Sequence, residues 1–190
     1  MALKLENEFV VQAPVEPTWE TLLDLERVAG CLPGATIEAS PEQGTYDGSM
    51  RVKLGPVSLS YKGTARLELV DDATHTAVFA VQGREARGQG SASATIRNRL
   101  VPADGATRVL VETELSVTGR PAQFGRGIMQ DVAASMLTDF AGCLSRLLAQ
   151  EPPARSAVGP NTESLEVGGV VGRAVFGRFK AFFLRLFRRR

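Results

Sequence analysis

Hydrophobic and polar residues alternate at the start of the chain. In the segment from Leu3 to Gln12, the apolar residues fall on one face: Leu3, Leu5, Phe9 and Val11. Successive side chains of a β-strand point to opposite sides, so this spacing predicts a strand with one covered face.

Two short helices are predicted next. Pro14 and Pro17 fit the first turn of a helix, where proline is tolerated. Its inner side carries Val15, Trp19, Leu22 and Leu23. The segment from Leu25 to Pro33 predicts a second helix, which the Pro33-Gly34 pair ends.

The apolar period is two from Ala35 to Val117. Turn signals at Gly55-Pro56, Asp71-Asp72 and Asp104-Gly105 lie between strands of this region, in which six strands are expected. Short turns at such intervals are typical of an antiparallel meander with one covered and one wet face. The predicted covered face carries many small residues, namely Gly48, Gly63, Ala65, Ala77, Ala92 and Ala94.

A helix of about 30 residues is predicted from Pro121 to Gln150. Its apolar stripe repeats at helical spacing through Phe124, Ile128, Val132, Met136, Phe140, Cys143, Leu144 and Leu147. The expected fold class is α+β, with a curved antiparallel sheet of about seven strands around a long C-terminal helix. This order of elements is the helix-grip architecture.

Small residues opposite the helix leave room for a cavity between the two layers. The predicted apolar lining is Tyr46, Met50, Leu59, Tyr61, Phe79, Phe124, Ile128 and Met136. Such a lining suits a lipophilic ligand. The alternative is a tightly packed core in which the strands bend at glycine.

Composition excludes several classes of function. Apolar residues make up 44% of the chain and charged residues 23%, which is ordinary for a globular domain. Cys31 and Cys143 are far apart in sequence and lack metal-ligand spacing, which favours two buried, reduced thiols in the cytoplasm. His75 is the only histidine and is expected to be exposed beside a turn.

No catalytic or metal-binding set is expected from these residues. Gly88-Gln89-Gly90 lies between two strands with no helix after it, which excludes a phosphate-binding loop. Glu85 and Asp131 are the acidic residues left for acid–base chemistry near a cavity. No signal peptide or membrane-spanning helix is expected either.

The chain after the predicted domain, residues 1–150, divides into two segments. Residues 151–166 contain three prolines and few large apolar residues, so a disordered linker is predicted. Residues 167–190 hold seven basic residues and no acidic ones. The 166 residues before them hold 15 basic and 21 acidic residues, so an acidic body, unsuited to nucleic acid, precedes a basic tail.

The tail forms an amphipathic pattern on a helical wheel. Its apolar arc includes Val175, Phe176, Phe179, Phe182, Phe183, Leu186 and Phe187. Its basic face includes Arg178, Lys180, Arg185 and Arg188. Basic and aromatic faces combined in this way favour reversible docking on an anionic membrane surface, here the inner face of the cell membrane. Docking on a partner protein is the alternative.

Several stretches resemble the CoxG family of carbon monoxide dehydrogenase subunits, of the START/Bet v 1-like helix-grip superfamily. They are LENEFVVQAPVEPTW from Leu5, CLPGA from Cys31, VKLGPVSLSYKGTARL from Val52, GQGSASA from Gly88 and GRPAQFGRGIMQDV from Gly119. The resemblance implies an accessory protein that accompanies the molybdenum-containing dehydrogenase without forming part of its catalytic core. It also implies membrane association and a lipophilic pocket between sheet and helix.

Two functional hypotheses follow. In the first, the body binds a respiratory quinone without any covalent cofactor, and the tail brings it to the bilayer. Arg120, Gln123 and Arg126 would then hydrogen-bond a quinone carbonyl near the pocket mouth. In the second, the protein is a ligand-free adaptor that recruits the dehydrogenase to the membrane. An enzyme on the same fold is a third and weaker hypothesis.

Overall fold

The computed structural model describes residues 1–42 and 44–150. The predicted linker, 151–166, and the predicted membrane-docking tail, 167–190, lie outside the described residues. The membrane-binding residues predicted from Val175 to Arg188 therefore stay predictions.

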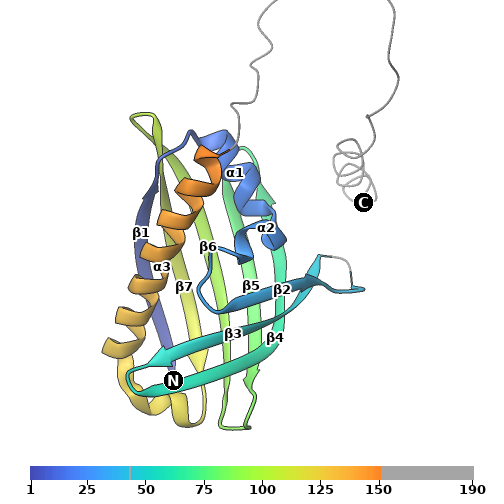
Figure 1. The fold of residues 1–190 in the computed structure, drawn as a ribbon, viewed down its shortest axis with the longest axis vertical. Helices are drawn as coiled ribbons and strands as arrows, with labels where there is room; N and C mark the ends of the chain where they lie inside the picture. Colours follow the sequence, from blue (N-terminus) through green and yellow to red (C-terminus); the bar gives the residue numbers. More distant parts are fainter. Residues whose placement is uncertain (43, 151–190) are drawn as a thin grey trace, which may run out of the picture. The chain divides into compact units, whose positions relative to one another are not determined.

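The elements follow the order expected from the sequence. They are β1 (Ala2–Val11), α1 (Val15–Leu23), α2 (Leu25–Ala29), β2 (Ala35–Ala39), β3 (Thr45–Leu54), β4 (Val57–Asp71), β5 (Thr76–Glu85), β6 (Ser91–Ala103), β7 (Ala106–Val117), η1 (Arg120–Phe124) and α3 (Gly125–Ala149). The predicted α+β class and helix-grip architecture are confirmed (Figure 1).

All seven strands form one antiparallel sheet in the order β1-β7-β6-β5-β4-β3-β2. The first strand pairs with the last, so the alternating pattern of β1 continues the covered face of β7. Glycines bring the central strands close together. Gly63 of β4 lies opposite both Gly48 of β3 and Gly83 of β5, and a Cβ on Gly63 would collide with the carbonyl oxygen of Gln82. Close backbone approach therefore explains this glycine without any ligand.

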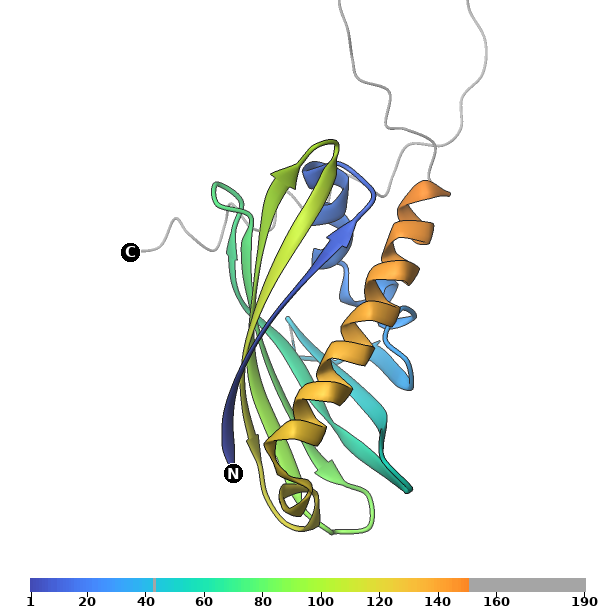
Figure 2. The same ribbon diagram turned by 90° about the vertical axis from the view of Figure 1, so that its left-hand side faces the viewer.

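Helix α3 crosses the covered face of the sheet, and Figure 2 shows it running the length of that face from the end where β1 begins. The predicted helix from Pro121 to Gln150 is wrong at its start. Residues Arg120–Phe124 form a separate 3-10 helix, η1. The break falls at Gly125, whose φ of 78° lies in the left-handed region, so the chain changes direction before α3 begins.

The apolar core forms two clusters. The first joins Phe9, Trp19, Phe79 and Phe140 with other residues from α1, α2 and the C-terminal half of α3. The second is smaller and joins Leu54 and Leu59 of the β3–β4 hairpin with Met129 of α3. The two clusters lie toward opposite ends of the helix, because Met129 and Phe140 are three helical turns apart.

Cys31 and Cys143 form a disulfide with a Cα–Cα distance of 5.3 Å. The prediction of two separate reduced thiols is therefore wrong. The two cysteines are 112 positions apart, and the chain between them contains β2 to β7 and most of α3. The disulfide therefore joins α3 to the loop that follows α2. Disulfides are typical of oxidising environments, so the argument for a reducing compartment, which relied on unpaired cysteines, no longer holds.

The segment Arg120–Ala149 is long and apolar enough to cross a membrane. The prediction that the chain has no membrane-spanning helix stays a prediction. One side of the helix is used in folding, because Met129, Phe140, Ala141, Leu144 and Leu148 of α3 are buried in the described domain. Length and composition alone do not separate a core helix from a membrane span.

Candidate functional site

Helix α3 is buried toward both ends but not in its middle. Met129 and Phe140 are buried, whereas no residue between them is. Val132 and Met136 lie three and seven residues after Met129, so they share its side of the helix, yet both are only half-buried. Val132 packs against the second core cluster, whereas Met136 packs against neither cluster, so the sheet covers the inward side of the central turns only in part.

Small and half-buried residues form the facing part of the sheet. Leu115, Ala94, Val81 and Ala65 stand in register across β7, β6, β5 and β4 on the covered face. All of them except Ala94 retain solvent exposure. The neighbouring row across β6, β5, β4 and β3 has no side chain larger than a methyl group and consists of Ala92, Gly83, Gly63 and Gly48.

These two surfaces lie between the two core clusters. We call them the central layer, defined by Met50, Ala65, Val81, Leu115, Val132 and Met136. In a filled core such inward side chains would be buried, because protein interiors are close-packed. Their partial exposure shows that these side chains are incompletely covered. The helix is held at its flanks instead, since it comes closest to β1 and β3.

Five residues of the predicted lining belong to the two clusters. Phe79 is buried in the first cluster, and Tyr46 packs against it. Leu59 is buried in the second cluster, and Tyr61 and Phe124 pack against it. These side chains would bound a ligand at its two ends rather than surround its middle.

The other three predicted apolar residues belong to neither cluster. Met50 and Met136 are half-buried, and Ile128 is 39% exposed on α3. Val81 and Leu115 were missing from the predicted lining, although the alternating pattern places both on the covered face. The cross-strand register that brings them together could not be read from one strand at a time.

A charged carboxylate lies at the end of the central layer formed by the β5–β6 loop. Glu85 is 5% exposed and accepts hydrogen bonds from the backbone N–H groups of Arg87 at 2.7 Å and Gln89 at 3.2 Å. Burial raises the pKa of Glu85, but N–H donors from Gln89, Arg87 and Ser60 outweigh it and hold the pKa below its usual value. The carboxylate therefore stays ionised and committed to the loop.

Tyr61 lies directly opposite Glu85 across β4 and β5. Burial and then the negative charge of Glu85 raise the pKa of the Tyr61 phenol. The pKa of Tyr46 is raised in the same direction, first by burial and then by Glu26 and Asp24. Both phenols are therefore protonated at neutral pH and can donate a hydrogen bond.

Close glycine packing fixes the loops at this end of the sheet. A Cβ on Gly90 would collide with the carbonyl oxygen of Thr118, and one on Gly119 would collide with that of Gln89. The backbone N–H of Arg120 donates to the Gln89 carbonyl at 2.9 Å. The GQG and GRP stretches of the sequence therefore join the β5–β6 loop to η1 and set where α3 begins.

The three polar residues predicted at the pocket mouth are all exposed. Arg120 and Gln123 lie on η1, and Arg126 lies in the first turn of α3. Arg126 Nη2 donates to the carbonyl oxygen of Lys4 on β1 at 3.5 Å. This contact directs Arg126 to the edge strand. Its predicted role toward a ligand stays a prediction.

Two open hollows occur in the described domain. One, of about 810 Å³, is lined mainly by outer-face residues such as Gln82, Thr64 and Glu114, and Val81, Ala94 and Leu115 also contribute to its lining. The other, of about 420 Å³, lies beside the Cys31–Cys143 disulfide, and its lining includes Pro33 and Arg146. Neither has the apolar lining expected for a lipophilic ligand.

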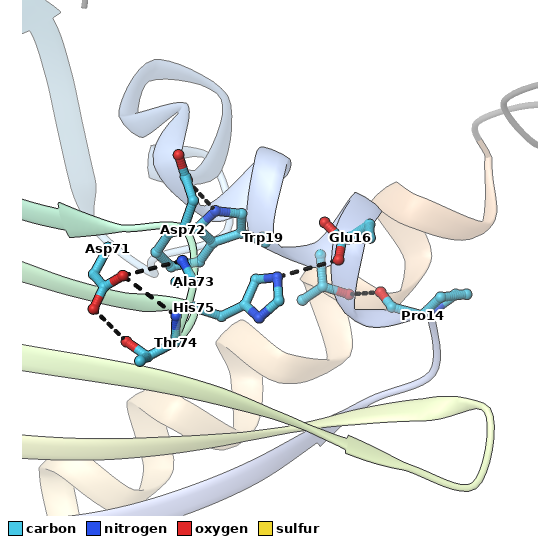
Figure 3. Close-up of polar contacts among 9 residues, drawn as sticks. Pro14, Glu16, Trp19, Asp71, Asp72, Ala73, Thr74 and His75 are labelled. Carbon is cyan, nitrogen blue, oxygen red and sulfur yellow. Dashed lines mark hydrogen bonds and ion pairs between the residues drawn. The ribbon is translucent and has the colours of Figure 1, made fainter.

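The only histidine lies in a structural cluster at the far end of the sheet (Figure 3). Trp19 Nε1 donates to Asp72 Oδ1 at 2.9 Å, and the Trp19 ring packs edge-on against His75. His75 Nε2 lies 3.2 Å from Glu16 Oε1. His75 is therefore half-buried rather than exposed as predicted, and these contacts attach α1 to the β4–β5 turn.

No cluster of three or more metal-ligating side chains occurs among residues 1–42 and 44–150.

Comparison with known proteins identifies the family and the fold. The family model for CoxG, a carbon monoxide dehydrogenase subunit, matches residues 8–149. No curated protein matches the chain.

Several solved structures resemble this chain at low sequence identity. A conserved protein from Geobacillus kaustophilus has a TM-score of 0.69 at 20% identity, covering 78% of this chain and 96% of its own. The ZhuI aromatase/cyclase from Streptomyces sp. R1128 has a TM-score of 0.58 at 13% identity, covering 79% and 95%. A norcoclaurine synthase mutant from Thalictrum flavum has a TM-score of 0.54 at 17% identity, covering 79% and 96%. These likenesses show the fold alone.

Proposed function

Because the chain belongs to the CoxG family of carbon monoxide dehydrogenase subunits, we propose that it is a non-catalytic accessory protein that carries a lipophilic molecule, a respiratory quinone, for that dehydrogenase. The observation that carries the proposal is the incomplete burial of the middle of α3. Val132 and Met136 are inward but only half-buried, and they lie over a floor of small and half-buried residues. An incompletely covered apolar layer gains free energy when an apolar molecule displaces water from it.

The residues around this layer suit a long apolar molecule with one polar head. Methionine side chains adapt to irregular apolar shapes, and Met50 and Met136 both belong to the layer. Tyr61, at the Glu85 end, supplies a protonated phenol that donates to a carbonyl oxygen. A quinone combines such carbonyls with an isoprenoid chain.

The reaction served by the family also points to a quinone. Oxidation of carbon monoxide releases electrons that must reach a respiratory acceptor, and quinones are confined to the lipid phase. A protein that holds a quinone and visits the bilayer would bring that acceptor to a soluble enzyme. The basic, Phe-rich tail predicted at residues 167–190 would provide the membrane contact.

A carrier rather than an enzyme fits the polar groups of the site. Catalysis of proton transfer needs a carboxylate or imidazole free to exchange a proton near the substrate. The Glu85 carboxylate is held by loop N–H groups, and His75 lies in the structural cluster with Trp19. The aromatase/cyclase and norcoclaurine synthase activities belong to those relatives.

Extraction of the purified full chain with organic solvent, followed by mass spectrometry, tests the proposal directly. The expected result is a co-purifying quinone near one molecule per chain. An extract without any quinone or other lipid, from protein made in a quinone-producing host, would leave the ligand-free adaptor as the better explanation.

A pair of matched variants tests whether the ligand binds in the central layer. Ala65→Leu adds three carbons within the central layer, whereas Ala80→Leu adds the same atoms to the outer face of β5. Ala65→Leu is expected to reduce bound ligand at least tenfold without loss of folding, because the added side chain fills space in the incompletely covered layer. Ala80→Leu should keep the ligand. Equal ligand content in both variants would place the ligand elsewhere.

A further inference from the structure

Seven of the fourteen basic residues within 1–150 gather at one end of the described domain, the end formed by the β3–β4 hairpin, the β5–β6 loop and η1. We call this group the basic pole. It consists of Arg51, Lys53, Lys62, Arg84, Arg87, Arg120 and Arg126, and all seven are exposed. The three connecting segments reach this same end in both Figure 1 and Figure 2.

The strand register places like charges next to each other at the pole. Lys62 of β4 lies directly opposite Arg84 of β5, and Arg51 is diagonal to Lys62 on the same outer face. Like charges in opposed positions destabilise a sheet. Farther from the pole the same face pairs opposite charges, with Lys4 opposite Glu114 and Arg97 opposite Glu112.

Nearby carboxylates do not neutralise the pole. Asp47 is the acidic residue diagonal to Lys62, but no ion pair within 4.0 Å joins any residue of the pole to a carboxylate among the described residues. Glu85 is the acidic residue inside this end, and it is buried and bonded to loop N–H groups. The opposite end carries the acidic residues Glu16, Glu20, Asp24, Glu26, Asp71, Asp72 and Asp104 and the basic residues Arg27, Arg99, Arg108 and Arg146, so acidic residues outnumber basic ones there. The described domain therefore carries a lengthwise separation of charge.

Apolar and glycine-containing tips accompany these charges. The β3–β4 hairpin ends in exposed Gly55 and Pro56, with half-buried Val57 next to them. Ile128 is 39% exposed, two residues after Arg126. Basic residues around shallow apolar tips are the combination that binds an anionic bilayer surface.

From this arrangement we propose that the basic pole is a membrane-contacting surface that meets anionic phospholipid headgroups, separately from the tail. The second core cluster, Glu85 and Tyr61 lie at the same end of the domain as the pole and bound one end of the central layer. Docking in this orientation would turn that end of the layer toward the lipid. A role of this contact in ligand transfer rests on the proposed carrier function. The test of membrane contact does not depend on that function.

The length of the remaining chain is compatible with a second contact on the same bilayer. Helix α3 has 25 residues and is about 38 Å long, and it ends away from the basic pole. The sixteen residues of 151–166 can span up to about 55 Å when extended. The predicted tail could therefore reach the membrane that the pole contacts.

Vesicle binding by two matched full-chain variants tests the pole. The pole variant is Arg84→Glu/Arg87→Glu/Arg120→Glu. The control, Arg97→Glu/Arg99→Glu/Arg108→Glu, makes the same change in net charge on β6 and β7. Both are sedimented with vesicles of phosphatidylcholine containing about 30% phosphatidylglycerol and with phosphatidylcholine alone, and circular dichroism checks that each is folded.

Each basic residue brought to an anionic surface raises affinity about fivefold. The pole variant is therefore expected to bind the anionic vesicles more than tenfold more weakly than the control does. Equal losses in the two variants, or no loss in the pole variant, would overturn the proposal.

Hydrogen exchange of the unaltered chain gives a readout that does not depend on the variants folding. Anionic vesicles are expected to slow exchange at residues 53–57, 86–90 and 119–127. Protection confined to other residues would overturn the proposal. Because the vesicles contain no quinone, a failure here is distinct from a failure to extract a ligand.

Discussion

Breaking the Cys31–Cys143 disulfide is expected to lower the stability of the folded domain substantially. The bond joins residues 112 positions apart, so it removes a large amount of conformational freedom from the unfolded chain. Chain-entropy scaling for a loop of this length gives about 16 cal/mol/K, or about 5 kcal/mol at 25 °C. Since most domains have a total stability of about 5–15 kcal/mol, this is a large fraction.

The corresponding change in melting temperature follows from the size of the domain. For chains of about this length, 1 kcal/mol shifts the melting temperature by roughly 2–4 °C. The reduced protein should therefore melt about 10–20 °C lower than the oxidised protein. Thermal unfolding followed by circular dichroism, with and without dithiothreitol, measures the shift.

A double variant controls for other effects of the reductant. Cys31→Ala/Cys143→Ala should melt near the reduced protein and should not respond to dithiothreitol. The reasoning would be refuted if reduction left the melting temperature of the natural sequence unchanged. Two free thiols in the non-reduced, folded protein would refute the disulfide itself.

Three further predictions concern single side chains. Gly63→Ala should destabilise the domain by about 3 kcal/mol, because the new Cβ would collide with the backbone of β5. Gly127→Ala should instead stabilise the domain by about 1 kcal/mol, because nothing opposes a Cβ in the first turns of α3. Urea denaturation of both variants measures the two changes in free energy of unfolding. Asp72→Ala should cost about 1–3 kcal/mol in the same assay, because it leaves the buried Trp19 N–H without its acceptor; the loss should vanish in a Trp19→Phe background. Glu85→Gln should destabilise the domain at pH 7 but progressively less below about pH 4.5. The pKa of the Glu85 carboxyl is lower in the folded state, so the ionised group stabilises the fold fully above the pKa of the unfolded state, and this stabilisation is lost as pH falls through the pKa of the folded state. Melting temperatures of both proteins from pH 3 to 7 measure the effect, and a difference in melting temperature that does not change with pH would contradict it.

Residue patterns predicted the elements of this fold well for a physical reason. Alternation reports which face of a strand is covered, and it indicated a first strand from Leu3 to Gln12 where β1 spans Ala2–Val11. The break before α3 escaped the same reasoning. An apolar stripe continues through Phe124, while the turn depends on one positive φ at Gly125.

Contacts between distant segments were beyond sequence reasoning. The spacing of Cys31 and Cys143 in the sequence does not show that they meet, because their approach depends on how the sheet between them folds. For the same reason, the sequence did not show that the predicted lining residues divide between two core clusters. Phe79 and Leu59 share a covered face, but packing assigns them to different core clusters, and only the register showed that Val81 and Leu115 lie between.

The methionines provide the most direct test of a lipophilic ligand in the central layer. The chain has four, and Met50 and Met136 belong to the layer, whereas Met129 is buried in the second core cluster and Met1 is at the exposed N-terminus. The measurement is a titration of methyl-¹³C-methionine protein with a short-chain quinone, followed by NMR. We expect saturable shifts at Met50 and Met136 that exceed those at Met129 and Met1. Unmoved Met50 and Met136 signals, at quinone concentrations that shift Met1 or Met129, would contradict a ligand in the central layer.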